Sequence, residues 1–309
     1  MKIIFFGTAD FAVTSLDYMI QQGKEVVAVV SIPPKAAGRG LKMRQSPVAE
    51  YALENNLNLL QPNDLNDNVF IQELLLYNAD LFAVVAFRKL PEAVWRIPPM
   101  GSINLHASLL PDYRGAAPIN RVIMNGEKIT GVTTFFINDR IDEGDMLLQE
   151  VMEISEDENA GELHDRLAEK GAVLLNDTIS KLEHGGIEAK RQSMSQSIKK
   201  APKLQKEDAR IIWNGGAKQI HDHIRGLSPY PVAYCYLNNK VLKIYKSSFI
   251  HQKHNLQEGT IVSDNRSYLK VAAKDGFVFF HQLQLEGKKP MDVKAFMNGI
   301  DVNNFKNLD

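Results

Sequence analysis

Short apolar runs alternate with longer stretches that have one apolar face in the first hundred residues. Three runs are almost wholly apolar, as strands buried on both faces are: Lys2–Phe6, Val26–Ile32 and Leu81–Ala86. Three stretches between them carry apolar residues at helical spacing: Phe11–Ile20, Pro47–Asn55 and Asn68–Tyr77. A strand, a turn, a helix and a second strand within about 30 residues make a βαβ unit. The pattern therefore predicts an α/β fold with an open, mostly parallel, Rossmann-like sheet flanked by helices.

Two further strands and a long helix are predicted in the middle of the chain. Ser102–His106 alternates as a short strand does, and Gly131–Ile137 is another apolar run. Asn159 precedes Glu162 by three residues, which is the spacing of a capping box. Leucines at helical spacing follow Glu162, so we expect a helix that packs this stripe into the core.

The pattern changes after residue 206 to short strand-like runs separated by turn residues. These runs are Ala233–Leu237, Val241–Tyr245, Gly259–Val262, Tyr268–Ala272 and Phe277–Leu283. About five short strands at close spacing predict a small OB-like β-barrel. Residues 190–206 hold six basic residues and no acidic one, which is typical of a linker. With two domains expected for 309 residues, we divide the chain into 1–189, a linker 190–206 and 207–309.

The net charge of −1 hides an asymmetry between the two halves of the chain. Residues 1–189 carry a net charge of −11 and residues 190–309 carry +10. A basic second half favours a polyanionic partner, although a solvated basic surface is an equal alternative from charge alone. Inside the acidic half, the segment 33–47 has four cations and no acid: Lys35, Arg39, Lys42 and Arg44. A long loop without secondary structure is predicted there, either a contact to a phosphate backbone or an exposed solubilising loop.

Cys235 is the only cysteine, so no internal disulfide can form, which fits a reducing compartment. The apolar run at the N-terminus is too short for a signal peptide. No stretch reaches the roughly 18 apolar residues of a membrane span. We therefore expect a soluble, cytoplasmic protein.

Asn104 and His106 are the strongest candidates for catalysis. Side chains two apart on a strand point to the same side, and an α/β sheet binds ligands where its strands end. An amide and an imidazolium both donate hydrogen bonds to a developing oxyanion, and an adjacent carboxylate, for which Asp142 is the candidate, favours a charged imidazole. This set suits acyl transfer to a nucleophile that the substrate carries. By spacing alone, however, N-x-H is also typical of a buried, hydrogen-bonded histidine.

Several other chemistries are disfavoured by missing motifs. There is no G-x-S-x-G elbow and no motif around Cys235, so a covalent enzyme intermediate is not indicated. Gly7 is not part of a G-x-G-x-x-G fingerprint, which disfavours a nicotinamide dinucleotide site. The acidic residues 138–145 do not match a calcium loop, so we expect no metal. His221 and His223 are predicted to be surface or capping residues in a helix before the barrel.

NLHASLLPDYRGAAPINR followed by DEGDML resembles the folate-dependent formyltransferase superfamily. The resemblance extends over the whole chain, through FFGTADFA at the start, AGRGLKMRQSPV in the basic loop, ARIIWN after the linker and GKKPM near the end. The AGRG loop and the C-terminal barrel point to the branch of this family that acts on tRNA.

The resemblance implies an enzyme that transfers the formyl group of 10-formyltetrahydrofolate to the free amine of initiator methionyl-tRNA, with no covalent enzyme intermediate and no metal. Asn104 would donate to the formyl oxygen, His106 would be a charged second donor, and Asp142 would hold His106 protonated and help to move the proton. The folate site would be lined by four residues, with backbone groups meeting the pterin: Ser108, Leu109, Leu110 and Pro111. Arg39 with its loop neighbours Lys35, Lys42 and Arg44 would contact the acceptor end of the tRNA, and the linker and barrel would contact its backbone. One copy of the chain is enough to contact the tRNA from both sides, so we expect a monomer.

Two other functions remain open. A formyltransferase acting on a small nucleotide or sugar-nucleotide amine would share N-x-H, SLLP and the aspartate, but would not need the basic loop, linker and barrel. A non-catalytic folate- or RNA-binding relative would not need all three of Asn104, His106 and Asp142.

Overall fold

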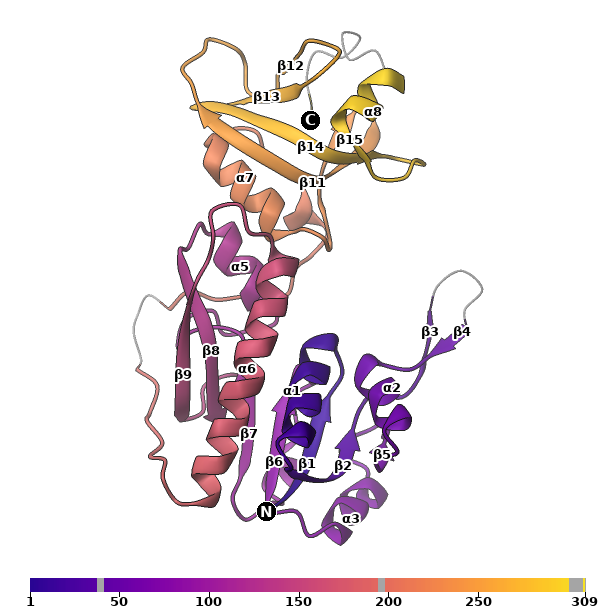
Figure 1. Ribbon diagram of the computed structural model, residues 1–309, viewed down its shortest axis with the longest axis vertical. Coiled ribbons are helices and arrows are strands. Elements are labelled where there is room, and N and C mark those ends of the chain that lie inside the picture. Colours follow the sequence, from indigo (N-terminus) through magenta and orange to yellow (C-terminus); the bar gives the residue numbers. More distant parts are fainter. Residues whose placement is uncertain (38–41, 194–197, 300–307, 309) are drawn as a thin grey trace. The chain divides into compact units, whose positions relative to one another are not determined.

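The computed structural model describes residues 1–37, 42–193, 198–299 and 308 (Figure 1). They form two compact units. The first unit consists of Met1–Gly115, Thr130–Met152 and His164–Lys200, and the second of Ala116–Ile129, Glu153–Leu163 and Ala201–Asp309. Two segments that precede residue 189 therefore pack with the second unit. The division of the chain at residues 189 and 207 stays a prediction.

The first unit is built on a seven-stranded sheet with the strand order β5-β2-β1-β6-β7-β8-β9. Its strands are β1 (Lys2–Gly7), β2 (Glu25–Val30), β5 (Leu59–Leu60), β6 (Leu81–Val85), β7 (Ser102–His106), β8 (Ile129–Phe136) and β9 (Met146–Glu153). The pairs from β5 to β7 are parallel, and β8 pairs with β7 antiparallel. The predicted open, mostly parallel sheet is confirmed.

Helices flank this sheet, as the buried strands require. They are α1 (Asp10–Gln21), α2 (Pro47–Glu54), α3 (Asn68–Leu76), α4 (Glu92–Trp95) and α6 (Ala160–Glu183). Ile3, Ile4, Phe5 and Phe6 of β1 are all fully buried, so both faces of this strand are covered. The capping box of α6 is confirmed, since Asn159 Oδ1 accepts from the Glu162 backbone at 3.0 Å and the Glu162 carboxylate accepts from the Asn159 backbone at 2.9 Å.

The second unit contains an antiparallel sheet with the order β10-β11-β14-β13-β12 and with β15 paired to β14. Its elements are α5 (Pro118–Met124), a 3₁₀ turn (Glu207–Ala209), α7 (Ala217–Gly226), β10 (Ala233–Leu237), β11 (Lys240–His251), β12 (Ile261–Ser263), β13 (Leu269–Ala273), β14 (Gly276–Leu285), β15 (Met291–Asp292) and α8 (Val293–Gly299). All five predicted strands are present, and β11 and β14 are longer than expected because they form the central pair of the sheet.

The expected exposure of His221 is wrong. Its side chain is only 2% exposed, because α7 packs against β11 and turns the imidazole toward the sheet. There Nδ1 lies 3.0 Å from the Ser247 hydroxyl and the ring lies against Phe249. Hydrophobic periodicity predicts which side chains share a face of a helix, but it does not predict which element packs against that face.

The basic segment 33–47 also differs from its prediction. Instead of a loop without secondary structure, the described residues form two short antiparallel strands, β3 (Lys35–Ala37) and β4 (Lys42–Arg44). Exposed Lys35 lies directly opposite exposed Arg44. Like charges at such a pair repel each other, so their pairing suits a surface that meets an anion. Arg39 lies outside the described residues.

No helix among the described residues combines the length and the hydropathy needed to cross a membrane.

Candidate active site

Strand β7 places Asn104 and His106 where the parallel strands end. Asn104 pairs with Val84 of β6, and His106, the last residue of β7, lies opposite Thr133 of β8. Gly7 pairs with Val85, which in turn pairs with Leu105, so β1, β6 and β7 end at the same edge. This is the edge at which ligands bind in open α/β sheets.

His106 is buried between the two groups that face its ring nitrogens. Nε2 lies 2.9 Å from the Tyr113 carbonyl oxygen, which can only accept, so this nitrogen carries a hydrogen. Nδ1 lies 3.8 Å from Oδ2 of Asp142. Nδ1 is therefore the ring nitrogen that faces a carboxylate.

The turn that holds Asp142 follows β8 and is kept in an unusual conformation. Asp142 has a φ of +56°, in the left-handed region that aspartate tolerates better than most residues. Its Oδ2 accepts a hydrogen bond from the Gly115 backbone at 2.9 Å. The segment 113–115 thus acts on both sides of the His106 ring. The Tyr113 carbonyl contacts Nε2, and the Gly115 amide holds the Asp142 carboxylate that faces Nδ1.

Gln192 is a residue of the site that the sequence did not indicate. Its side chain is 6% exposed, and its Nε2 donates to the carbonyl oxygens of Asp142 at 2.9 Å and Gly144 at 2.8 Å. Its Oε1 accepts from Nε and Nη2 of Arg114 at 3.0 and 2.6 Å. A glutamine in a basic segment carries no sequence signal, because its partners lie 48 to 78 residues away. The described start of the predicted linker therefore holds the turn that carries Asp142 in place.

The segment after His106 is tied down through its own backbone. Thr133 Oγ1 donates a hydrogen bond to the Ser108 carbonyl at 2.7 Å and accepts one from the Leu110 backbone amide at 3.2 Å. Gln149 donates to the Leu110 carbonyl at 2.8 Å. Thr133 and Gln149 are thus further residues of the site that sequence patterns did not reveal. The half-buried side chains of Leu109 and Pro111 leave apolar surface for a ligand.

Two polar side chains at this edge have no partner within the part of the chain that the structure describes. Thr8 Oγ1, directly after β1, is buried without a hydrogen bond. The half-buried Asn104 amide also takes part in none. Buried polar groups are rarely left unsatisfied, so these two side chains are available to the polar atoms of a ligand at this edge.

The described residues of the basic segment do not join this site. Lys35, Lys42 and Arg44 lie in the β3–β4 hairpin, which leaves the body of the unit beside α2 (Figure 1). Among the described residues, no group of three or more His, Cys, Asp or Glu could hold a metal ion.

Comparisons with known proteins extend along both units. A formyl transferase family model matches residues 1–179, and a model for the formyl transferase C-terminal domain matches residues 203–301. A methionyl-tRNA formyltransferase of Flavobacterium johnsoniae is 48% identical over 97% of this chain and 96% of its own length. One from Bacteroides thetaiotaomicron is 44% identical over 97% of this chain and 95% of its own length.

Solved structures share the fold at lower identity. The N-formyltransferase of Helicobacter canadensis, in complex with folinic acid and dTDP-3-aminofucose, has a TM-score of 0.66 and 21% identity and covers 91% of this chain and 98% of its own. HypX from Aquifex aeolicus has a TM-score of 0.67 and 17% identity and covers 99% of this chain and 48% of its own.

Proposed function

This chain belongs to the formyl transferase family, and we propose that it transfers the formyl group of 10-formyltetrahydrofolate to the amino group of initiator methionyl-tRNA. The observation that carries the proposal is 48% identity, over nearly the full length of both chains, to a methionyl-tRNA formyltransferase. The N-formyltransferase in complex with dTDP-3-aminofucose has only 21% identity, so its likeness concerns the fold and not the acceptor.

Asn104 is the first oxyanion donor in this proposal. Its amide lies at the strand edge without a partner in the described chain, so it is free to donate to the formyl oxygen. Donors placed in advance where charge develops lower the barrier, since they need no reorganisation during the reaction. 10-Formyltetrahydrofolate supplies the activated formyl group when bound.

His106 and Asp142 handle charge and proton transfer. The Nε2 hydrogen is held by the Tyr113 carbonyl, so Nδ1 is left to exchange a proton with the reacting amine. Asp142 Oδ2, 3.8 Å from Nδ1, stabilises positive charge on the imidazole ring. The 3.8 Å separation is longer than a direct hydrogen bond, which leaves room for Nδ1 to serve a substrate group as well.

Ser108, Leu109, Leu110 and Pro111 hold the folate in this proposal, mainly through the side chains of Leu109 and Pro111. The Ser108 and Leu110 carbonyls and the Leu110 amide already have partners within the chain, so their part is to keep the segment rigid. A segment fixed in this way loses little conformational freedom when a ligand binds.

The β3–β4 hairpin and the basic second half are proposed to contact the tRNA. Lys35 and Arg44 are exposed and lie opposite each other, and phosphates would relieve their mutual repulsion. The protein is proposed to act as a monomer in the cytoplasm.

The test is an assay with the purified chain, 10-formyltetrahydrofolate and three acceptors: charged initiator methionyl-tRNA, charged elongator methionyl-tRNA and a dTDP-amino sugar. We expect formylmethionine on initiator tRNA at the highest kcat/KM. Faster formylation of the amino sugar would replace this proposal by the sugar-nucleotide alternative, and no formylation of any acceptor would support a binding protein.

A further inference from the structure

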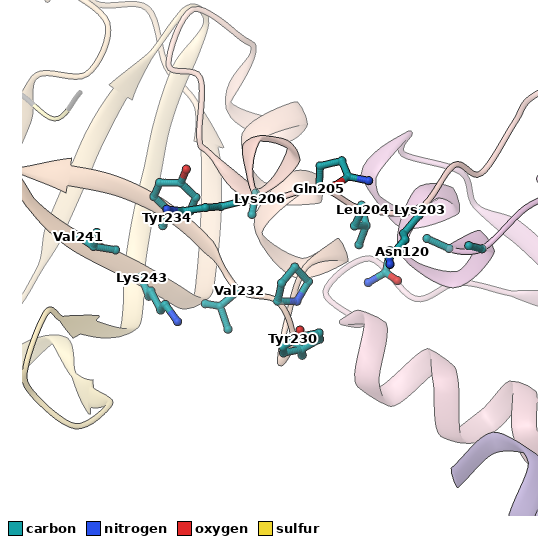
Figure 2. Close-up of a pocket in the computed structure, with 14 residues that line it drawn as sticks. Asn120, Lys203, Leu204, Gln205, Lys206, Tyr230, Val232, Tyr234, Val241 and Lys243 are labelled. Carbon is teal, nitrogen blue, oxygen red and sulfur yellow. The ribbon is translucent and has the colours of Figure 1, made fainter. Parts of the chain in front are cut away.

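A groove of about 670 Å³ lies within the second unit (Figure 2). Its walls come from α5, the segment 203–206, the segment 230–234 and β11, and Figure 2 shows labelled side chains from each of them. Small alanines just before α5 and on the 3₁₀ turn leave the space open, while Leu204, Val232 and Val241 line it with apolar surface. The groove therefore has room for a ligand and offers it apolar surface.

Three lysines give the groove a positive charge: Lys203, Lys206 and Lys243. None of them forms an ion pair with a described residue, and no carboxylate is among the described lining residues. The neighbouring Asp208 is already engaged, with its Oδ2 3.0 Å from Arg121 and accepting from the Gln205 backbone at 2.8 Å. These hydrogen bonds, first that from Gln205 and then that from Arg121, hold the pKa of Asp208 below its usual value. The cations therefore remain available to an anionic ligand.

Tyr230 presents an aromatic ring at the groove. It is 82% exposed, so the ring gains no stability from burial within the chain. It lies between two prolines, Pro229 and Pro231, whose fixed φ angles restrict the backbone on both sides. A pre-positioned exposed ring next to lysines is the arrangement with which proteins stack an unpaired base and bind its phosphates.

We propose that this groove binds one unpaired nucleotide of an RNA, with its base on the Tyr230 ring and its flanking phosphates at Lys203, Lys206 and Lys243. The inference rests on the proposed function only for the identity of the RNA, which is the tRNA substrate. The chemistry of the groove is argued from its own residues. The charge of +10 on residues 190–309 is complementary to such a ligand. A free nucleotide shares this chemistry and is separated from RNA by the experiment.

The experiment measures binding of a fluorescein-labelled single-stranded RNA of about eight nucleotides to the full chain by anisotropy. Tyr230→Ala should weaken binding about fivefold to hundredfold, because base stacking on one aromatic ring contributes that much. Tyr230→Phe keeps the ring and should bind as the wild type does. Equal affinity of wild type and Tyr230→Ala, or equal weakening by Phe and Ala, would overturn the stacking role. Since Tyr230 is exposed, neither variant should affect folding, which a thermal melt checks.

Salt dependence separates the lysines from the ring. Lys243→Ala should reduce the slope of log K against log salt by about 0.7 for the single strand, while Tyr230→Ala leaves that slope unchanged. Lys253→Ala is the matched control, since Lys253 is an exposed lysine of the same unit that does not line the groove. The same loss of slope in both lysine variants would mean a diffuse surface charge and would overturn the groove as the site.

Two further arms fix the ligand. Adenosine monophosphate is titrated against the wild type and Tyr230→Ala, and uncharged tRNA is titrated against the same two proteins. A Tyr230-dependent affinity for tRNA supports the proposal, whereas Tyr230-dependent binding of the mononucleotide alone overturns the assignment to RNA. If the wild type binds RNA through Tyr230 but formylates no methionyl-tRNA, the proposed function fails while the groove stands.

Discussion

At the scale of single residues, the site depends on which atom of His106 faces which partner. The Tyr113 carbonyl requires a hydrogen on Nε2, so Asp142 acts on Nδ1. The backbone amide of Gly115 then positions the Asp142 carboxylate, and Gln192 positions its peptide group. The sequence identified the three polar side chains but not the three groups that orient them.

Asn104→Ala and His106→Ala should each lower kcat for formylation of methionyl-tRNA by about 10²–10³-fold, because the first removes a donor to the developing oxyanion and the second removes the group that exchanges a proton with the amine. Steady-state assays with both substrates varied measure the effect. Asn55→Ala, at an exposed asparagine that ends α2, is the matched control and should match the wild type. A loss of only a few-fold in Asn104→Ala would exclude this amide from the reaction.

Gln192→Ala should lower kcat roughly tenfold to hundredfold, because a displacement of about 1 Å in a catalytic group has such an effect. Gln72→Ala, at an exposed glutamine of α3, should change nothing.

A double-mutant cycle tells this positioning role from general damage. If Gln192 acts through Asp142, then Gln192→Ala should cause no further loss of kcat in an Asp142→Asn background. Losses that multiply across the cycle would contradict the role given to Gln192.

At the scale of elements, strands and helices bring chemistry together at their ends. β7 delivers Asn104 and His106, and the turn after β8 delivers Asp142. That turn passes so close to β8 that a Cβ on Gly144 would overlap the Phe136 carbonyl oxygen. The turn therefore requires a glycine at position 144. The sequence alone does not reveal this requirement, because it comes from the nearby Phe136 carbonyl.

Gly144→Ala should destabilise the chain by about 1–3 kcal/mol or more, since the turn has to move to admit the methyl group. It should also lower kcat, because Asp142 moves with the turn. Urea unfolding and the formylation assay measure the two effects. Gly186→Ala is the control, since the only atom near its added Cβ is at 3.8 Å. Wild-type stability of Gly144→Ala would show that the turn adapts freely.

Helix α7 should make stability depend on pH through His221. Burial, and next the positive charge of Arg225, lowers the pKa of His221 below its usual value. The unfolded chain, in which a histidine has a pKa of about 6.5, therefore binds the proton more tightly than the folded chain. The stability that the neutral side chain contributes is complete above about pH 6.5 and is lost as the pH falls through the lower folded value.

Urea unfolding between about pH 7.5 and pH 5 tests this expectation. His221→Phe keeps a ring of similar size but does not titrate, so its stability should fall less over this range than that of the wild type. His184→Gln removes an exposed histidine at the end of α6 and should leave the wild-type profile unchanged. Parallel profiles for wild type and His221→Phe would exclude this histidine as the source.

At the scale of the whole molecule, charge is unevenly divided along the chain. The acidic first 189 residues include the candidate catalytic residues Asn104 and His106, and the basic remainder supplies Tyr230 and the three lysines of the groove. Within the acidic part, the β3–β4 hairpin supplies a local patch of cations.

Binding of uncharged initiator tRNA should fall by about 10³-fold between 50 and 200 mM salt if about six phosphates are contacted. Arg44→Ala should raise KM for methionyl-tRNA and reduce the salt dependence, while KM for 10-formyltetrahydrofolate stays unchanged. Arg96→Ala, at an exposed arginine paired with Glu92, is the control. Equal increases in both KM values would mean that the hairpin supports the fold and not the tRNA.

The sequence by itself determined the main buried strands and helices of the mostly parallel sheet, the five strands after residue 206, the placement of Asn104 and His106 on β7, and the family. These features depend on local periodicity and on motifs that lie within a few residues of one another. Only the tertiary structure decided that Gln192 and Gly115 orient Asp142, that Tyr113 sets the hydrogen on His106, that His221 is buried, and that lysines from the segment 203–206 and β11 share a groove with Tyr230. The physical reason is that these contacts join residues far apart in the chain, and close packing, not any repeating pattern, brings them within reach.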